Sequence, residues 1–573
     1  MNRTSILLPA LLLLCSCGNS SVEVDAAKDW LLIPASDKAP AATLTISCDG
    51  TNILGQPQLI NPAADSADYW IPVDISDWKG KTLEINISDA SGSDLALSGI
   101  RQSDSRELNL DEPYRQIYHF TPEFGWTNDP NGMVYHDGKY HLAYQSNPYG
   151  TRHYNMHWGN AVSEDLVHWQ DLPFIIAPDE LGQIFSGSAV VDADNSAGFG
   201  ENAIVAMYTS AGSTQAQSLA WSTDGGMSYK VYEDNPVLEE PGMRDFRDPK
   251  LLKYGDGWVV SVAAGDRIIF YGSDDLKNWS KLSEFGEDMG AHGGVWECPD
   301  LLPLDYRGER KWVLIVNINP GGPNGGSAAQ YFIGDFDGTT FTADPLPYPL
   351  WVDEGMDNYA GVTFSNTGER QIFLGWMSNW LYSEHTPTVN FRNGMTIARD
   401  LSLRSDGEKL FLASSPSPEI LAARGRAVSF KNGMKDGSCE IPELLPDNDG
   451  AYELCMTVKP GKSGKFQLSL GNSLGEQLVW NFDFNALTLT LDRSASGRTD
   501  FSDKFGKSDI LAHLVGRDSY ELRLFVDRQS TELFINDGDV SFTNTVFPSE
   551  PYNSLKLTSD DATVDGIKVY ELK

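Results

Sequence analysis

The sequence predicts an all-β protein: a five-bladed β-propeller, followed by a β-sandwich and preceded by a small N-terminal β domain. The main observation is a recurring phrase of polar turn, apolar strand, Gly-containing turn and second apolar strand. Five copies start roughly 50 to 60 residues apart, a period typical of propeller blades. The C-terminal part shows alternating strands with regular turns and no convincing helix. At 573 residues, the chain is also too long for one ordinary core.

The chain begins with a segment typical of export signals. It has one Arg, an apolar run from Ile6 to Leu14, and then small residues. Such a run is too short to span a bilayer, which takes about twenty residues, but it suits a signal peptide. The phrase LCSC, ending at Cys17, resembles the lipobox of bacterial lipoproteins. This resemblance implies a signal over residues 1–17, lipidation of Cys17, and export to a bacterial membrane, on its periplasmic face or at the cell surface. A plain secretory signal is the alternative.

Residues 18–112 are expected to form the small β domain. The phrases LEINIS and WIPVDIS alternate apolar and polar residues, as half-buried strands do. No catalytic pattern occurs there, so we expect a structural or positioning role.

Residues 113–410 hold the five repeats and predict where a functional site lies. NDPNGMVYHDGKYHLAYQ, RDPKLLKYGDGWVVSVA and ECPDLLPLDYRGERKWVLIV follow one scheme, and two further copies begin near Phe185 and Tyr359. In a propeller, the first strand of every blade lines the central channel, so residues at the starts of those strands converge at one mouth. The residues at these starts are Asp129, Ser186, Asp248, Glu297 and Tyr359.

Residues 411–573 carry strand phrases such as FQLSLG, LVWNFDF and LTLTLD, separated by regular turns. This pattern favours a β-sandwich.

The charge balance narrows the class of partner. The formal net charge is −37, from 43 basic and 80 acidic side chains, and no Lys/Arg stripe interrupts it. Such a field repels nucleic acid and anionic lipid surfaces. A neutral substrate such as a sugar is compatible with it, and contact with a membrane is expected only through the lipid anchor.

The cysteines and histidines do not indicate a metal site. Cys48, Cys298, Cys439 and Cys455 match no zinc spacing. We therefore expect neither a metal nor a cofactor. Cys439 and Cys455 could form a disulfide in an exported protein.

Carboxyl groups from different blades suit glycosidic bond cleavage, whose transition state resembles an oxocarbenium ion. One carboxylic acid protonates the departing oxygen, and a second carboxylate attacks the anomeric carbon or activates water. Three carboxyl groups, those of Asp129, Asp248 and Glu297, are expected to meet in this site.

Three ordered motifs resemble those of glycoside hydrolase family 32, the β-fructofuranosidases. They are WTNDPNG from Trp126, FRDP from Phe246 and ECP from Glu297, with FSGS from Phe185 as a supporting phrase. LFVDRQSTELFINDG from Leu524 resembles the C-terminal sandwich of the same family.

The resemblance implies roles for individual residues. Asp129 would be the nucleophile of a retaining reaction, and Glu297 the general acid and then general base. Asp248 would hold fructose hydroxyls and stabilise the transition state, with Arg247 orienting the carboxylates. The residues implied to bind substrate are Asn128, Gln145, Phe185, Ser186, Arg247, Trp158 and Trp376.

Some positions depart from the family pattern. Thr127 replaces a common Met, and Asn160 replaces a His. His153 stands where many members have a Trp that walls the sugar pocket; it is interpreted either as a polar wall or as a structural histidine. Trp158 and Trp376 remain candidates for either pocket or core.

The sequence therefore predicts a retaining hydrolase that cleaves β-fructofuranosyl linkages in fructans (levan or inulin, with sucrose as a further candidate) and releases terminal fructose. The alternatives are an endo-acting fructanase, an inverting five-bladed hydrolase such as an arabinosidase, and an inactive glycan-binding surface lipoprotein. The expected partner is a fructan polysaccharide or oligosaccharide, and the oligomeric state is left open.

Overall fold

The computed structural model describes residues 20–63, 65–88, 93–430, 434 and 437–573. The chain divides into two compact units, one ending at Glu107 and one spanning Leu108–Lys573. The proposed lipidation site, Cys17, lies outside the described residues. Among the residues that are described, no helix is long and apolar enough to span a bilayer.

The first unit consists of two small sheets and one short helix. One sheet has the order β1-β7-β3-β4, with β5 also paired to β3, and the other has the order β6-β2-β8. The side chains of Leu44, Ile46, Ile85 and Ile87 alternate with polar neighbours and are fully buried, as the period-2 pattern predicts. The elements of this unit are β1 (Ser20–Asp25), β2 (Trp30–Ala35), β3 (Ala42–Cys48), β4 (Thr51–Asn52), β5 (Gln58–Ile60), β6 (Tyr69–Asp74), η1 (Ser76–Trp78), β7 (Thr82–Ser88), α1 (Ser93–Gly99) and β8 (Arg101–Ser103).

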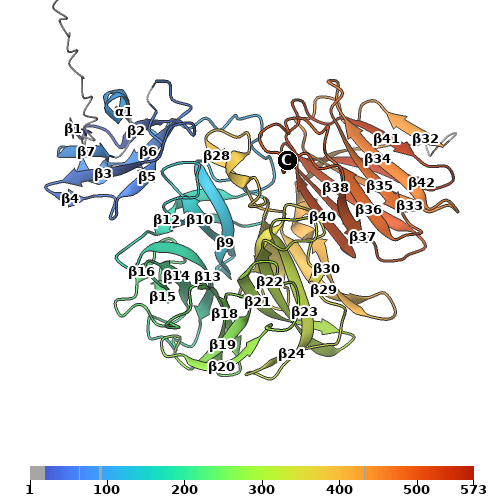
Figure 1. Cartoon of the computed structure of the whole chain (residues 1–573), viewed down its shortest axis with the longest axis horizontal. Helices are drawn as coiled ribbons and strands as arrows, with labels where there is room; N and C mark the ends of the chain where they lie inside the picture. The colour runs from blue at the N-terminus through green and yellow to red at the C-terminus, as the bar shows by residue number, and fades with distance from the viewer. Residues whose placement is uncertain (1–19, 64, 89–92, 431–433, 435–436) are drawn as a thin grey trace, which may run out of the picture. The chain divides into compact units, whose positions relative to one another are not determined.

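The second unit begins with five antiparallel sheets, the blades of a propeller (Figure 1). Written from the innermost strand outward, the first four blades are β9 (Gly125–His136), β10 (Lys139–Asn147), β11 (His157–Ser163), β12 (Gln170–Ile176); β13 (Gln183–Asp192), β14 (Ala203–Ala211), β15 (Gln215–Ser222), β16 (Lys230–Val231); β17 (Phe246–Tyr254), β18 (Gly257–Ala264), β19 (Ile268–Ser273), β20 (Ser280–Phe285); and β21 (Val295–Tyr306), β22 (Glu309–Asn319), β23 (Ala328–Phe336), β24 (Phe341–Ala343), with β25 (Leu350–Trp351) also on β23. The fifth is β26 (Tyr359–Thr363), β27 (Ile372–Trp376), β29 (Arg399–Ser405) and β30 (Leu410–Pro416).

The five innermost strands form a closed ring around the channel. Each of β9, β13, β17, β21 and β26 contacts the next, and β26 contacts β9 again. The short strand β28 (Phe391–Arg392) pairs in parallel with the start of β9 and joins the end of the propeller to its first blade. The strand that carries Asp129 is therefore paired on both sides where it begins.

The sandwich follows the propeller. Its sheets have the orders β31-β42-β33-β38-β39-β40 and β32-β41-β34-β35-β36-β37, and large apolar side chains such as Leu454, Trp480 and Leu524 fill the core between them. The strands are β31 (Arg424–Ser429), β32 (Ser438–Ile441), β33 (Tyr452–Lys459), β34 (Lys465–Gly471), β35 (Gln477–Asp483), β36 (Thr488–Asp492), β37 (Ile510–His513), β38 (Tyr520–Asp527), β39 (Ser530–Ile535), β40 (Val540–Thr545), β41 (Ser554–Thr558) and β42 (Thr563–Leu572).

Charged side chains bind the sandwich to the propeller. The His119 ring, just before β9, lies 2.8 Å from an Asp527 oxygen and 2.7 Å from a Glu532 oxygen. Arg399 of β29 also donates to Glu532 and, at 2.8 Å, to Asp353. Burial alone would lower the pKa of His119, but its hydrogen bonds to Asp527 and Glu532 raise that pKa to about 9. His119 is thus held as a cation between two carboxylates.

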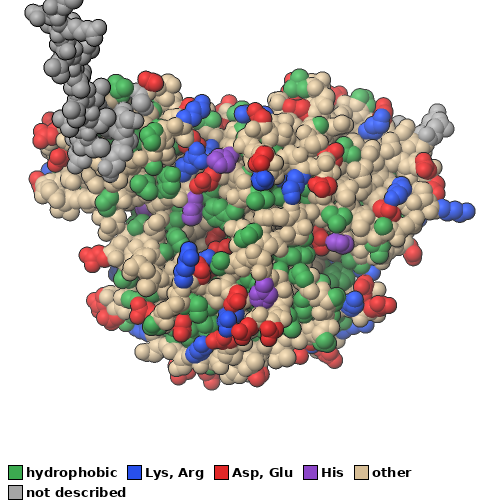
Figure 2. Space-filling view, viewed as in Figure 1, with side chains coloured by type: hydrophobic (Ala, Val, Ile, Leu, Met, Phe, Trp, Pro, Cys, Tyr) green, Lys and Arg blue, Asp and Glu red, His purple; other side chains and the backbone are tan. Residues whose placement is uncertain are grey.

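The all-β fold class is confirmed, and the visible surface carries more acidic than basic side chains (Figure 2). The considered disulfide is not formed: Cys439 lies on β32 and Cys455 on β33, in different sheets, and Cys455 makes no disulfide within the described part of the chain.

Candidate active site

The starts of the five innermost strands converge on one cavity of about 270 Å³. Asp129, Ser186, Asp248, Glu297 and Tyr359 all line it, one from each blade. The complete lining is Asn128, Asp129, Gln145, His153, Phe185, Ser186, Gln215, Asp245, Arg247, Asp248, Glu297, Tyr359 and Trp380.

The residues around Asp129 explain the turn-like sequence NDPNG. The Asn131 side chain donates to the Asp129 carbonyl at 3.0 Å, and its own oxygen accepts from the Gly187 backbone of the next blade at 3.1 Å. Gly132 has a φ of 51°, and a Cβ there would lie 2.8 Å from the Trp158 ring. Glycine therefore allows the chain to bend against Trp158 while Asp129 faces the cavity.

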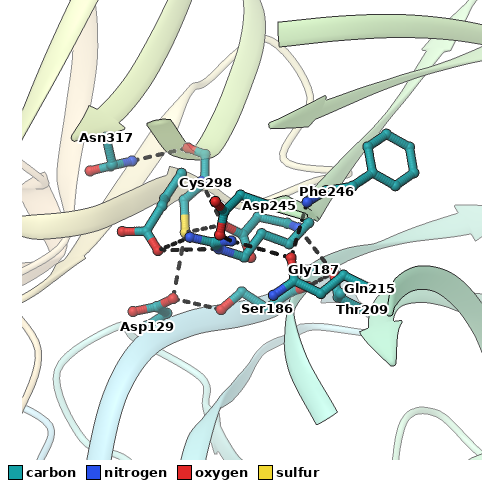
Figure 3. A network of polar contacts seen from close by, with 12 residues as sticks. Asp129, Ser186, Gly187, Thr209, Gln215, Asp245, Phe246, Cys298 and Asn317 are labelled. Carbon is teal, nitrogen blue, oxygen red and sulfur yellow. Dashed lines mark hydrogen bonds and ion pairs between the residues drawn. The ribbon is translucent and has the colours of Figure 1, made fainter. Parts of the chain in front are cut away.

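Three side chains contact the Asp129 carboxylate. Ser186 donates to Oδ2 at 2.6 Å, and Asn128 donates to Oδ1 at 2.9 Å. The Cys298 thiol approaches Oδ2 at 3.5 Å, and Figure 3 shows its sulfur pointing toward Asp129. Burial raises the pKa of Asp129, and the charge of Glu297 adds to this, while the Ser186 and Asn128 hydrogen bonds oppose it. These donors help Asp129 to remain ionised.

The Asp248 residue is buried more deeply than Asp129. Its Oδ2 accepts from the Cys298 backbone N–H at 3.0 Å and lies 3.6 Å from the Cys298 sulfur. Burial raises the pKa of Asp248 to about 7; Arg247 opposes this rise, and the charges of Glu297 and Asp129 reinforce it. The same thiol thus contacts two carboxyl groups that repel each other.

The two carboxylate oxygens of Glu297 are held by different residues. Arg247 donates to Oε1 through Nε at 3.2 Å and Nη2 at 2.9 Å. The Tyr359 hydroxyl donates to Oε2. Arg247 is itself oriented by Asp245 at 2.8 Å and Gln215 at 3.2 Å, both through Nη1. The guanidinium therefore has little freedom, and it fixes the direction of the Glu297 carboxyl group.

Three inner strands share one irregular backbone position. Asp248, Cys298 and Ala360 each have positive φ, at 64°, 43° and 53°, and each sits inside a bulge against the neighbouring strand. The residues just before the first two, Arg247 and Glu297, form the ion pair described above. Equivalent positions of adjacent blades thus contact one another around the channel.

The predicted binding residues divide into two groups. Asn128, Gln145, Phe185, Ser186 and Arg247 line the cavity. Trp158 and Trp376 do not: both side chains are fully buried and lie outside the lining.

The two tryptophans instead belong to the core. Trp158 packs beneath Gly132 and donates to the Phe185 carbonyl at 3.1 Å, and Trp376 packs against Trp126 and Trp380. Of the tryptophans Trp158, Trp376 and Trp380, only Trp380 lines the cavity.

Sequence reasoning missed Gln215, Asp245 and Trp380. Asp245 stands three residues before Asp248, and this closeness to the FRDP motif was its one usable signal. Gln215 and Trp380 lie outside the motifs, so their place in the cavity depends on how the blades pack. His153, left open by the sequence, lines the cavity.

The arrangement has the chemistry of a glycoside hydrolase. It places a carboxylate supported by donors, Asp129, in the same cavity as a second carboxyl group, Glu297, held in a different environment. Carboxyl groups with unlike surroundings suit the two different roles that glycosidic cleavage requires.

Comparison with known proteins identifies the family. The profile described as "Glycosyl hydrolases family 32 N-terminal domain" matches residues 119–414, and "Glycosyl hydrolases family 32 C terminal" matches residues 419–571. The chain belongs to glycosyl hydrolases family 32 and is a glycoside hydrolase of the β-fructofuranosidase class.

Individual relatives and solved structures agree with this family assignment. A levanase of Bacillus subtilis is 43% identical, over 81% of this chain and 70% of its own. An extracellular exo-inulinase of Aspergillus awamori is 36% identical, over 80% of this chain and 94% of its own. The structure of fructofuranosidase from Schwanniomyces occidentalis complexed with fructose superimposes with a TM-score of 0.75 at 32% identity, over 81% of this chain and 99% of that one.

Proposed function

We propose that this protein hydrolyses β-fructofuranosyl linkages of fructans with retention of configuration and releases terminal fructose. The observation that carries the proposal is the pairing of Asp129, supported by Ser186 and Asn128, with Glu297, held by Arg247 and Tyr359 in the same cavity. Relatives named levanase, exo-inulinase and invertase support this substrate class.

In the proposed first step, an Asp129 oxygen bonds to the anomeric carbon as the glycosidic bond breaks. Glu297 gives its proton to the departing oxygen. Because Arg247 donates twice to Oε1, we place that proton on Oε2, to which the Tyr359 hydroxyl donates once the carboxyl group is ionised. In the second step, Glu297 takes a proton from water, the water oxygen bonds to the anomeric carbon, and the bond to Asp129 breaks. Asp248 lines the same cavity and is proposed to accept hydrogen bonds from hydroxyls of the sugar.

Release of single fructose units is supported by the limited size of the cavity. About 270 Å³ is slightly below the usual range for drug-sized ligands, so it suits one sugar unit at a chain end. A relative described as a levanbiose-producing levanase illustrates the alternative of longer products. We also propose that the protein is exported and anchored through Cys17, since relatives are described as extracellular.

The test of substrate and product is a time course of the signal-free protein with inulin, levan and sucrose, followed by chromatography. Fructose alone from the earliest points is expected. A ladder of oligosaccharides would overturn release of terminal fructose, and no product from any of them would overturn the whole proposal.

Retention is tested by adding methanol as a competing acceptor. The β-anomer of methyl fructofuranoside is expected, and the α-anomer would contradict a double displacement. The variant Asp129→Asn should lose turnover by at least about 10³-fold while still binding fructan in an affinity gel. Full activity in this variant would exclude Asp129 as nucleophile.

A further inference from the structure

His153 lies in a loop between β10 and β11 and lines the same cavity as the three carboxyl groups. Its backbone N–H donates to Glu384 at 3.2 Å, which fixes the loop from behind. Its ring meets Trp380 edge-on, with centroids 5.0 Å apart at 82°, and Trp126 at 5.8 Å and 67°. Two tryptophans therefore hold the imidazole in one orientation at the cavity wall.

Most polar side chains of the cavity already have protein partners. Asn128 and Ser186 donate to Asp129, while Gln215 and Asp245 accept from Arg247. These groups are committed to orienting the catalytic carboxyl groups.

The imidazole of His153 differs in this respect. Within the part of the chain that the structure describes, neither of its ring nitrogens hydrogen-bonds to protein, although the ring is partly accessible from the cavity. A polar ring that is fixed by packing and left without a protein partner is suited to meet a ligand.

We infer that His153 is a sugar-binding residue whose imidazole hydrogen-bonds a hydroxyl of the fructosyl unit in the cavity. This inference rests on the proposed function. A neutral imidazole offers one donor and one acceptor, matching a hydroxyl group, which can do both. Burial lowers the pKa of His153, with Glu384 and Glu297 opposing, and this favours the neutral ring near pH 7.

The ring contacts with the two tryptophans can be separated from the hydrogen bond by substitution. His153→Phe keeps a ring for Trp126 and Trp380 but removes both nitrogens. His153→Gln places an amide near the Nε2 position, and His153→Asn places one near Nδ1. His168→Phe serves as the matched control, because His168 is exposed on an outer turn and lies outside the cavity.

The experiment measures fructose binding by calorimetry and kcat/KM on fructan for all five proteins, together with Tm. Loss of one hydrogen bond, worth about 1 kcal/mol, should weaken fructose binding roughly 5-fold in His153→Phe. Either His153→Gln or His153→Asn should recover most of this loss, and His168→Phe should match the wild type. kcat/KM should follow the same order.

Two results would overturn the inference. One is fructose affinity in His153→Phe within twofold of the wild type at unchanged Tm. The other is equal loss in the Phe, Gln and Asn variants, which would show that a hydrogen-bonding group near either nitrogen position does not restore binding. Calorimetry with fructose does not need turnover, so a wild type that binds fructose but hydrolyses no fructan would refute the proposed function and leave the test of His153 intact.

Discussion

Asp248 has surroundings that disfavour its charge. It is 5% exposed, lies beside two other carboxyl groups, and takes a positive φ of 64°. Its pKa is raised from 3.8 to about 7, first by burial. Between these values the folded protein binds more protons than the unfolded chain, so stability falls as the pH rises through this window.

Asp248→Asn should therefore stabilise the fold at neutral and alkaline pH while reducing activity. We expect a gain of up to a few kcal/mol at pH 8, and a smaller gain at pH 4, because the wild-type carboxyl group is then protonated. Thermal unfolding at the two pH values measures this.

The matched control is Asp305→Asn, since Asp305 is exposed and pairs only with Arg310 within the described residues. This variant should show little change. A Tm of Asp248→Asn that is lower than wild type at pH 8 would contradict the argument.

At this scale, sequence reasoning located the carboxyl groups because each begins a repeat, and repeats share a geometry. It named Trp158 and Trp376 as candidates for either pocket or core and missed Trp380, since all three are large aromatics outside the repeat starts. Their difference is burial, and that depends on blade packing. Trp158 packs against Gly132 and is fully buried, whereas Trp380 lines the cavity.

Among the secondary-structure elements, β38 and β39 contact the segment before β9 through one charged histidine, His119. His119 is buried between Asp527 and Glu532, with its pKa raised from 6.5 to about 9. A raised histidine pKa contributes stability that is fully present below 6.5 and is lost as the pH rises through about 9.

His119→Gln should lower the free energy of unfolding by about 2–4 kcal/mol at pH 6. The difference from wild type should shrink at pH 9.5, because the wild-type ring is then neutral. Denaturant unfolding at both pH values provides the measurement, with His513→Gln as control, since His513 pairs with Glu354 at an exposed position. An equal deficit at both pH values would show that His119 acts through shape alone.

The strands themselves were largely predictable, because alternation and turn residues are local signals. The His119 contacts were not, since 408 residues separate it from Asp527. The helix α1 was also missed, because SDLALSG is a single short stretch within a domain of strands.

On the scale of the whole molecule, all cavity residues belong to the second unit. A protein that starts at Leu108 retains every one of these residues, so it should keep kcat/KM on short fructo-oligosaccharides within about twofold of the full chain. Steady-state kinetics of the two proteins test this, with Tm measured for each to show that both are folded. A loss of more than tenfold would assign the first unit a part in catalysis.

The shared bulge of the inner strands has a consequence for how such a site can evolve. One backbone position, repeated around an axis, holds Asp248 in one blade, Cys298 in the next and Ala360 in the one after. Of these three side chains, only Asp248 lines the cavity, so only its position can change the chemistry of the site by exchange of one side chain. Ala360 is the member of this series without a functional group, and its side chain is fully buried outside the cavity lining, so a larger side chain there would have to displace the core packed around it.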